Sequence, residues 1–419
     1  MSRPADPPPG IPAVELDASA TEGTGRRSPI GVPLLLTLSL LAAFSPVATD
    51  LYLPGFPDMV TDLATDASGV QLTLTTFLLG LSAGQVLWGP LSDRFGRRGP
   101  LIVSAVICVV AGVLAAVAPS LPLLVLARVV QGLTGAGGLV IGRAVLADLT
   151  SGREAARAFT LMMTVGGVAP ILAPLVGSLL IGPLGWRGLL WVLAGVGVVS
   201  LAAVVVAVPE TLPAARRGHA AIPFPAAVRR VLASHEYRRH VTVFVLAFGT
   251  LMAYISASPF LYQGVLGMSE LEYGVIFGVN AAGMVGAGWL TSHVMQRIEP
   301  RRLVLLGVGI QAFATVSFVA LAASGAPGWT YAVAIFVAVV TLGMILGTSA
   351  GLAMSHVREV AGTGSALLGS AQHALGAVVS PLVGLGGTRS ALVPALVMAG
   401  CALLALTATL RSFRARSDD

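Results

Sequence analysis

Long apolar runs separated by short polar breaks occupy this chain from residue 31 to residue 411. A bilayer core needs about 20 apolar residues in a helix, and twelve runs reach this length. The glycines and prolines inside them do not argue against helices, because neighbouring helices cover the backbone groups that they free. The pattern predicts an all-α polytopic membrane protein with twelve transmembrane helices, at approximately 31–54, 70–92, 100–118, 122–146, 156–181, 187–207, 240–263, 272–295, 302–323, 329–354, 362–385 and 390–411.

The polar breaks alternate between arginine-rich and arginine-poor. The arginine-rich breaks include DRFGRR after the second run and QRIEPRR after the eighth, and both ends of the chain belong to this set. The arginine-poor breaks contain only Arg187 and Arg389. Because arginine-rich loops remain on the cytoplasmic side, we expect a multi-pass protein of the cytoplasmic (plasma) membrane with both termini in the cytoplasm.

The longest break lies between the sixth and seventh runs and divides the chain into two halves. GQVLWGPLSDRFGRRGPL after the second run resembles GAGWLTSHVMQRIEPRRL after the eighth, and REAARAFTLM before the fifth resembles REVAGTGSAL before the eleventh. Six-helix repeats of this kind are typical of transporters, whose substrate binds near the midplane between the halves. The predicted organisation is a disordered cytoplasmic tail at 1–29, six-helix halves at 30–207 and 240–411, a cytoplasmic linker at 208–239 and a cytoplasmic tail at 412–419.

Composition agrees with a membrane protein and excludes several function classes. Only 11% of the residues are charged and the mean hydropathy is +0.87, whereas soluble proteins contain about 25% charged residues. The net charge of +6 comes from arginines at the ends of apolar runs, so we expect no nucleic-acid partner. Cys108 and Cys401 fall inside apolar runs, where cysteine packs as a small apolar residue. Without a nucleophile elbow, phosphate loop or zinc motif, we expect neither an enzyme nor a cofactor or metal site.

Ionisable side chains inside a membrane span are costly and therefore are candidate functional residues. Asp50 in the first run and Arg128 in the fourth lie near the arginine-poor side, both roughly 9 Å below the surface at 1.5 Å of helix rise per residue. We expect them to be partners, or neighbours around one polar cavity. Burial opposes ionisation of Asp50 and Arg128 favours it, so this carboxyl group could load and release a proton. Alternatively, Asp50 caps the break at Pro54 and Pro57, and Arg128 only anchors the bundle.

Further polar and aromatic residues of the spans are candidates for lining a substrate cavity between the halves. His373 lies near the middle of the eleventh run, beside Gln372. A single membrane histidine more often satisfies local hydrogen bonds than relays protons, and the other candidates equally fit a packing role. The candidate lining residues are Phe44, Tyr52, Gln131, Tyr254, Asn280 and His373.

Several stretches resemble a known family. GPLSDRFGRRGPL at residues 89–101 matches the loop signature after helix two of the major facilitator superfamily, Gly-x-Leu-x-Asp-Arg-x-Gly-Arg-Arg-x-x-Leu, at every specified position. TDLYLPGFPDM, LARVVQGLTGAGGLVIGRAVLADL, GGVAPILAPLVGSLL and YISASPFLYQ resemble helices one, four, five and seven of its Bcr/CflA group of drug:proton antiporters. The resemblance covers the whole chain in preserved order.

This resemblance implies the major facilitator fold and export of amphiphilic drugs or antibiotics against inward proton flow, by rocking of the two halves of a monomer in the lipid bilayer. It assigns proton handling to Asp50 and coupling to Arg128. Sealing against proton leak is assigned to a helix-five motif of Gly167, Pro170, Pro174 and Gly177. Alternatives are export or import of a metabolite (a sugar, amino acid or siderophore) on the same fold and, from another class, a non-transporting membrane sensor.

The charged break at residues 89–101 is a candidate cytoplasmic gate. The plainest interpretation assigns its arginines to membrane orientation alone, but orientation does not explain Asp93 or the glycines. We expect Asp93 to face the start of the eleventh span, near Thr363 and Ser365, while the cytoplasmic side is closed. A carboxylate is favoured there by the exposed N–H groups of the helix N-terminus.

Arg97 should reach Asp148 or Glu154 beyond the fourth span. The second half has Ser292 where the first-half loop has Asp93, so the second copy is expected to lack an equivalent contact. The candidate gate residues are Gly89, Asp93, Arg94, Gly96, Arg97, Arg98 and Asp148.

Overall fold

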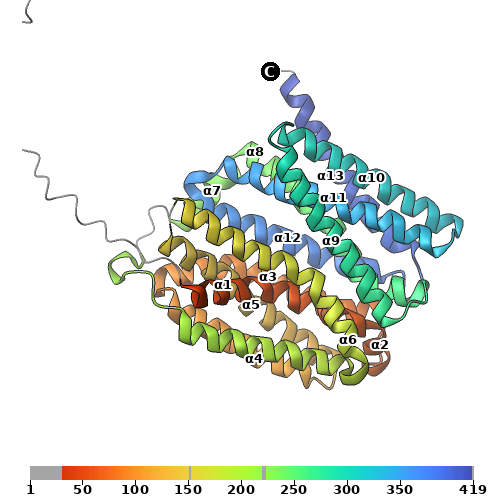
Figure 1. Ribbon diagram of the computed structural model, residues 1–419, viewed down its shortest axis with the longest axis horizontal. Helices are drawn as coiled ribbons and strands as arrows, with labels where there is room; N and C mark the ends of the chain where they lie inside the picture. Colours follow the sequence, from red (N-terminus) through yellow and green to blue (C-terminus); the bar gives the residue numbers. More distant parts are fainter. Residues whose placement is uncertain (1–30, 151, 219–222, 418–419) are drawn as a thin grey trace, which may run out of the picture.

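The computed structural model describes residues 31–150, 152–218 and 223–417, and every regular element in these ranges is helical. Figure 1 shows α1 to α6 in the lower part of the view and α8 to α13 in the upper part, with α12 between them. The elements are α1 (Val32–Asp50), η2 (Leu53–Gly55), α2 (Phe56–Asp62), α3 (Ala67–Phe95), α4 (Arg98–Ala116), α5 (Leu121–Leu149), α6 (Gly152–Ala207), η3 (Ala214–Arg216), α7 (Phe224–Ala233), α8 (His235–Pro259), η4 (Phe260–Val265), α9 (Glu270–Val294), α10 (Pro300–Ser324), α11 (Gly328–Ser355), η5 (Arg358–Val360), α12 (Ala361–Gly384) and α13 (Leu392–Ser417).

The predicted membrane helices are confirmed. In the described part of the chain, eleven helical segments are long and apolar enough to cross a bilayer. One of them, in α6, contains both the fifth and the sixth predicted spans, and its backbone leaves helical geometry at Gly185, where φ is 65°. A positive φ is readily adopted by glycine, so the chain turns there without a loop. All twelve predicted spans are therefore helical.

Two helix ends differ from the expected boundaries. α8 begins at His235 rather than near residue 240, because Ser234 caps it by accepting a hydrogen bond from the Tyr237 backbone N–H. α13 continues to Ser417, through most of the tail predicted at 412–419. The tail predicted at 1–29 lies outside the described residues.

The two halves share a close helix pairing that the weak sequence repeat only suggested. In the first half, a Cβ added to Gly132 of α5 would lie 2.0 Å from the Phe77 carbonyl oxygen of α3. In the second half, a Cβ added to Gly343 of α11 would lie 2.0 Å from the Met284 carbonyl oxygen of α9. Small residues of this kind let membrane helices approach backbone to backbone. The same element pair is thus built in the same way twice.

Contacts between the halves are concentrated toward the arginine-poor end. There Gln263 donates to the Pro54 carbonyl oxygen at 3.2 Å, and Phe56 packs against Phe260. The α3–α12 pair continues the interface toward the middle, with Ser82 bonded to Ser370 at 2.9 Å.

Gln85, bonded to His373 at 2.9 Å, marks the last polar contact between the halves in the described residues. Beyond this pair, toward the arginine-rich end, none of the hydrogen bonds or ion pairs among them joins one half to the other. Among the described residues, the polar contacts between the halves are thus confined to the arginine-poor end and the middle of the interface.

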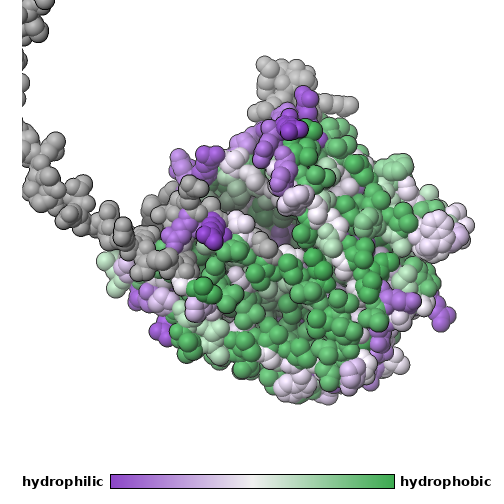
Figure 2. Space-filling view, in the orientation of Figure 1, coloured by the Kyte–Doolittle hydropathy of each residue, from purple (hydrophilic) through white to green (hydrophobic). Residues whose placement is uncertain are grey.

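Figure 2 agrees with this arrangement. The visible face is hydrophobic across its middle, as a lipid-facing surface should be, and hydrophilic residues gather toward its edges. The surface is hollowed between the hydrophilic groups in the upper part of the view. Large apolar side chains such as Leu36, Trp289 and Phe313 remain more than half exposed, which suits contact with lipid rather than water.

Candidate functional site

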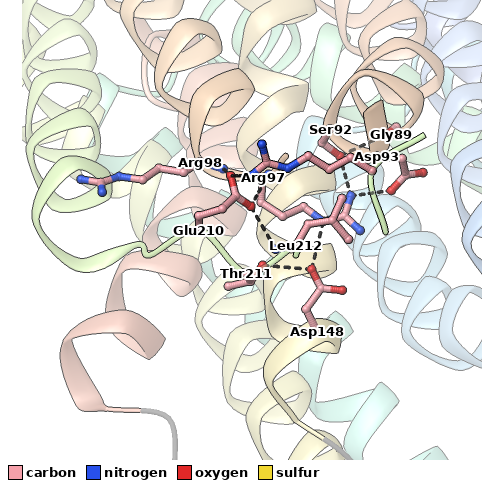
Figure 3. Close-up of polar contacts among 10 residues, drawn as sticks. Gly89, Ser92, Asp93, Arg97, Arg98, Asp148, Glu210, Thr211 and Leu212 are labelled. Atoms are coloured by element: carbon pink, nitrogen blue, oxygen red, sulfur yellow. Dashed lines mark hydrogen bonds and ion pairs between the residues drawn. The ribbon is translucent and has the colours of Figure 1, made fainter. Parts of the chain in front are cut away.

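The candidate gate is built on a sharp reversal between α3 and α4. Gly96 ends α3 with φ of 93°, a conformation that glycine adopts readily. The reversal directs the Arg97 side chain back over its own half, where it is 8% exposed. Its guanidinium donates to Ser92 Oγ at 2.8 Å, Asp93 Oδ1 at 2.5 Å and Asp148 Oδ2 at 3.0 Å (Figure 3). Burial opposes its charge, but the two carboxylates outweigh burial and raise the pKa of Arg97.

The segment between α6 and α8, called the connector below, completes this cluster through Glu210. Glu210 was not among the residues predicted from the sequence. Its carboxylate accepts the backbone N–H of Arg97 at 2.9 Å and that of Arg98 at 3.3 Å, and it pairs with Arg217 at 3.6 Å. Burial opposes ionisation of Glu210, but these backbone hydrogen bonds and Arg217 outweigh it and hold its pKa below the ordinary value. Thr211 adds a hydrogen bond to Asp148 Oδ2 at 2.9 Å. The connector therefore closes over the α3–α4 reversal (Figure 3).

The remaining gate residues have lesser contacts. Arg94 lies over the Phe95 ring at 5.3 Å, and Arg98 donates to the Val205 carbonyl oxygen at 2.9 Å; both side chains are exposed. Gly89 packs near Val140 of α5. These contacts, like those of Arg97, join elements of the first half to one another.

Only one of the two expected gate contacts is present. Arg97 reaches Asp148, rather than Glu154, as an acidic partner. Asp93 bonds Arg97 within its own half, and in the described residues it makes no hydrogen bond to Thr363 or Ser365 of α12. The physical reason is the separation of the halves at this end. The approach of Asp93 to α12 stays a prediction for the closed state.

The second half has an ionic cluster after all, but it uses a different acid. Ser292 is exposed and its hydroxyl donates to the Trp289 carbonyl oxygen. The acidic residue is Glu236, in the first turn of α8, which pairs with Arg239 and with Arg301, each at 3.1 Å. The loop comparison missed Glu236 because it lies in another element.

Arg128 is buried without contacting Asp50, so the expected pairing is wrong for this conformation. Its guanidinium donates to Gln131 Oε1 at 2.6 Å, the Ala48 carbonyl oxygen at 2.7 Å, Tyr52 Oη at 3.3 Å and the Thr73 carbonyl oxygen at 3.4 Å. It also lies 4.7 Å from the Tyr52 ring centroid. Arg128 is thereby fully engaged within the first half.

Helix geometry explains why equal depth did not produce a pair. Ala48 and Tyr52 are four residues apart and share the face of α1 that meets Arg128. Asp50 lies midway between them, about 200° around the helix at 100° per residue. Its side chain therefore projects to the other side, toward the second half. The equal depth of Asp50 and Arg128 in the membrane does not determine the direction in which the Asp50 side chain points around α1.

Asp50 faces an aromatic cluster of the second half. It is 2% exposed, and one carboxyl oxygen, Oδ1, has no hydrogen-bond partner. The hydroxyls of Tyr254 and Tyr273 lie within electrostatic range of it. In this cluster Asn280 donates to Tyr254 Oη at 2.9 Å and to Tyr262 Oη at 3.2 Å.

The candidate lining residues divide into two groups. Tyr254, Asn280 and His373 lie at the contact between the halves. The other three, by contrast, face the interior of the first half in this conformation, and their role in lining the cavity between the halves stays a prediction. Phe44 packs against α5 and α6, Tyr52 bonds Arg128 and Thr73, and Gln131 bonds Arg128.

The helix-five motif lies where α6 meets a helix of each half. A Cβ added to Gly177 would lie 2.0 Å from the Leu51 carbonyl oxygen, just after α1, and Ser178 meets Gly274 of α9. Pro174 is buried and Pro170 is half-buried. Gly167, closer to the arginine-rich end, has nothing within 4 Å of an added Cβ. Close packing is thus confined to the Gly177 end.

One membrane charge was overlooked. Arg143 lies inside the predicted span 122–146, in GLVIGRAVLADL, and is half-buried on α5. It lies three residues before the predicted end of that span. The same signal that identified Arg128, a charge inside an apolar run, was available for Arg143.

Comparison with known proteins identifies the family. The family model described as Major Facilitator Superfamily matches residues 38–381, most of the chain. The chain belongs to the major facilitator superfamily. The predicted family and fold are therefore confirmed, and the molecule is a multi-pass transporter of that superfamily.

Individual relatives refine this picture. The transporter is 33% identical over 360 residues to the uncharacterized MFS-type transporter YdgK of Bacillus subtilis, covering 85% of this chain and 90% of the relative. It is 26% identical over 379 residues to the bicyclomycin resistance protein homolog of Haemophilus influenzae, covering 89% and 94%. Among solved structures, that of a D-xylose-proton symporter is similar, with a TM-score of 0.72, 16% identity and coverage of 89% and 96%. At that identity the structural likeness shows the fold alone.

Proposed function

We propose that this transporter exports amphiphilic drugs or antibiotics from the cytoplasm in exchange for protons, by alternating access, as a Bcr/CflA-type antiporter. The main support for this proposal is the buried carboxyl group of Asp50. Among the described residues it is the only aspartate or glutamate in the buried class, and it lies between the halves with one oxygen free of hydrogen bonds. A buried carboxylate without a cation partner is unstable in a membrane unless it takes up a proton.

The arrangement around Asp50 suits a proton carrier better than a structural ion pair. Arg128, the counter-ion expected from the sequence, is bound by four acceptors of its own half. Asp50 instead faces hydroxyl groups of the second half. When the halves rock, the hydroxyls move with one half and the carboxyl group with the other. The surroundings of Asp50 thus change between states, which is the requirement for proton release on one side.

We assign the arginine-rich end to the cytoplasm, with both termini there and the protein in the plasma membrane. This follows the bias of arginine toward cytoplasmic loops. The conformation described here is then open toward the cytoplasm, the state in which an exporter admits substrate. The name of the Haemophilus relative, a bicyclomycin resistance protein homolog, supports a drug-like substrate.

The test is accumulation of a lipophilic dye and a panel of antibiotics in an exporter-deficient bacterium that expresses the chain. We expect lower accumulation that is abolished by an uncoupler. Asp50→Asn should remove this uncoupler-sensitive export while leaving the protein in the membrane. The matched control is Asp58→Asn, an exposed acidic residue of α2, which should export normally. Full export by Asp50→Asn at equal expression would contradict the assignment.

A further inference from the structure

Arg143 is a charged residue of a membrane span for which the described part of the structure provides no hydrogen-bonding or ionic partner. It is half-buried in the last third of α5, and in the described part of the chain it takes part in no hydrogen bond or ion pair. Arg128 on the same helix, in contrast, has four hydrogen-bond acceptors. A membrane arginine without a protein partner needs water or a ligand to satisfy its five donors.

The direction of Arg143 follows from its neighbours on α5. Gly138 and Gly142 face α1, where added Cβ atoms would meet Leu41 and Leu38. The other flank of α5 meets α3, where Val140 packs against Gly89. At 100° per residue, position 143 falls between these two flanks. This side of α5 lies beside α3, which itself meets α12 of the second half.

The second half presents a matching surface across the gap. His373 of α12 lies within electrostatic range of Arg143, and its ring packs edge-on against half-buried Phe248 of α8 at 5.7 Å between centroids. Asp148, one and a half turns along α5, is engaged by Arg97 and Thr211. Among the described residues, Arg143 is therefore an unpaired cation within electrostatic range of α12, where His373 is 8% exposed and its neighbour Phe248 is half-buried.

We propose that Arg143 is a binding residue for the anionic group of an amphiphile, with the apolar body of that molecule lying against half-buried Phe248. A guanidinium binds a carboxylate, sulfonate or phosphate through two parallel hydrogen bonds. The site lies on the arginine-rich side of the Gln85–His373 contact, where the halves are apart. The inference that this amphiphile is the exported substrate rests on the proposed function; the anion site itself does not.

The experiment compares two dyes that differ by one sulfonate. 8-Anilinonaphthalene-1-sulfonate is anionic, and N-phenyl-1-naphthylamine is its neutral counterpart. Binding of each to the purified transporter in zwitterionic lipid nanodiscs is measured by fluorescence titration. Arg143→Gln should weaken binding of the sulfonate about 10- to 100-fold, the loss of charged hydrogen bonds, and leave the neutral dye unchanged. Arg143→Lys should retain most of the sulfonate binding.

The control is Arg302→Gln, which removes an arginine whose side chain is 75% exposed at the same end of the molecule, and it should leave binding of both dyes unchanged. Equal sulfonate affinity in the native protein and Arg143→Gln would overturn the proposal. Repeating the titration with phosphatidylglycerol in the nanodiscs identifies the source of the anion. Competition would make a lipid headgroup the occupant, and its absence a soluble substrate. If sulfonate binding depends on Arg143 but no proton-driven export exists, the proposed function fails and the anion site stands.

Discussion

Replacing Arg97 or Arg98 with glutamine separates a structural role of the charged break from a topological one. Both changes remove one positive charge from the same loop, so an orientation role alone predicts equal effects. The side-chain contacts are unequal. Arg97 is 8% exposed and bonds Ser92, Asp93 and Asp148, whereas the exposed Arg98 side chain has one bond, to a backbone carbonyl oxygen.

The size of the difference follows from the partners. The Ser92 bond contributes about 1 kcal/mol and the Asp148 pair about 1–2 kcal/mol. The Asp93 side chain is 53% exposed, so its contact is screened and adds about 0–1 kcal/mol, and the same range holds for Arg98. Arg97→Gln should therefore cost about 1–4 kcal/mol more than Arg98→Gln. A chain of this size loses on the order of 1–2 °C in Tm per kcal/mol, a difference of roughly 1–8 °C.

The assay is thermal unfolding of the purified variants in one detergent, with the orientation of each variant checked in cells by a C-terminal reporter. We expect native orientation for both variants and a lower Tm for Arg97→Gln. High salt should leave most of the difference, because the Arg97 guanidinium is buried. Equal Tm values for the two variants would refute the structural role and leave orientation as the only function of these arginines.

Two further outcomes are expected. Gly177→Ala should reduce the free energy of unfolding by about 1–3 kcal/mol and so lower Tm, because the added Cβ would lie 2.0 Å from the Leu51 carbonyl oxygen. Gly167→Ala is the control, because an added Cβ there has nothing within 4 Å. Equal Tm values for the two variants would contradict the close packing at Gly177. The pKa of Glu210 is lowered in the folded protein, so its stabilisation is present above the unfolded pKa of about 4.3 and is lost as pH falls through the folded value. The Tm advantage of the native protein over Glu210→Gln should accordingly be full at pH 7 and disappear in acid; an advantage independent of pH would show that charge is not its source.

The sequence was sufficient for the spans because apolar length is a local property that a bilayer enforces. It was insufficient where a contact depends on rotation about a helix axis. Asp50 and Arg128 were placed at equal depth, yet Ala48 and Tyr52 occupy the face that meets Arg128.

Other parts of the site depend on tertiary structure. Glu210 acquires its role only when the connector folds back onto the α3–α4 reversal, and no local pattern marks that return. The contact of Asp93 with α12 depends on which end of the molecule is closed, a property of the conformational state rather than of the residues. The Arg97–Asp148 pair was predictable because the two lie at neighbouring ends of helices within one half.

The connector also sets a limit on movement. At one end it is attached to the first half, where the Gly218 N–H donates to the Asp93 carbonyl oxygen at 3.0 Å. At the other it is attached to the second half, where Arg230 of α7 pairs with Glu359. Only six peptide steps separate Gly218 from Phe224, the first residue of α7, and they can extend to about 20–22 Å in any conformation. The covalent length of this segment therefore limits how far the two halves can separate at the arginine-rich end while both attachments hold.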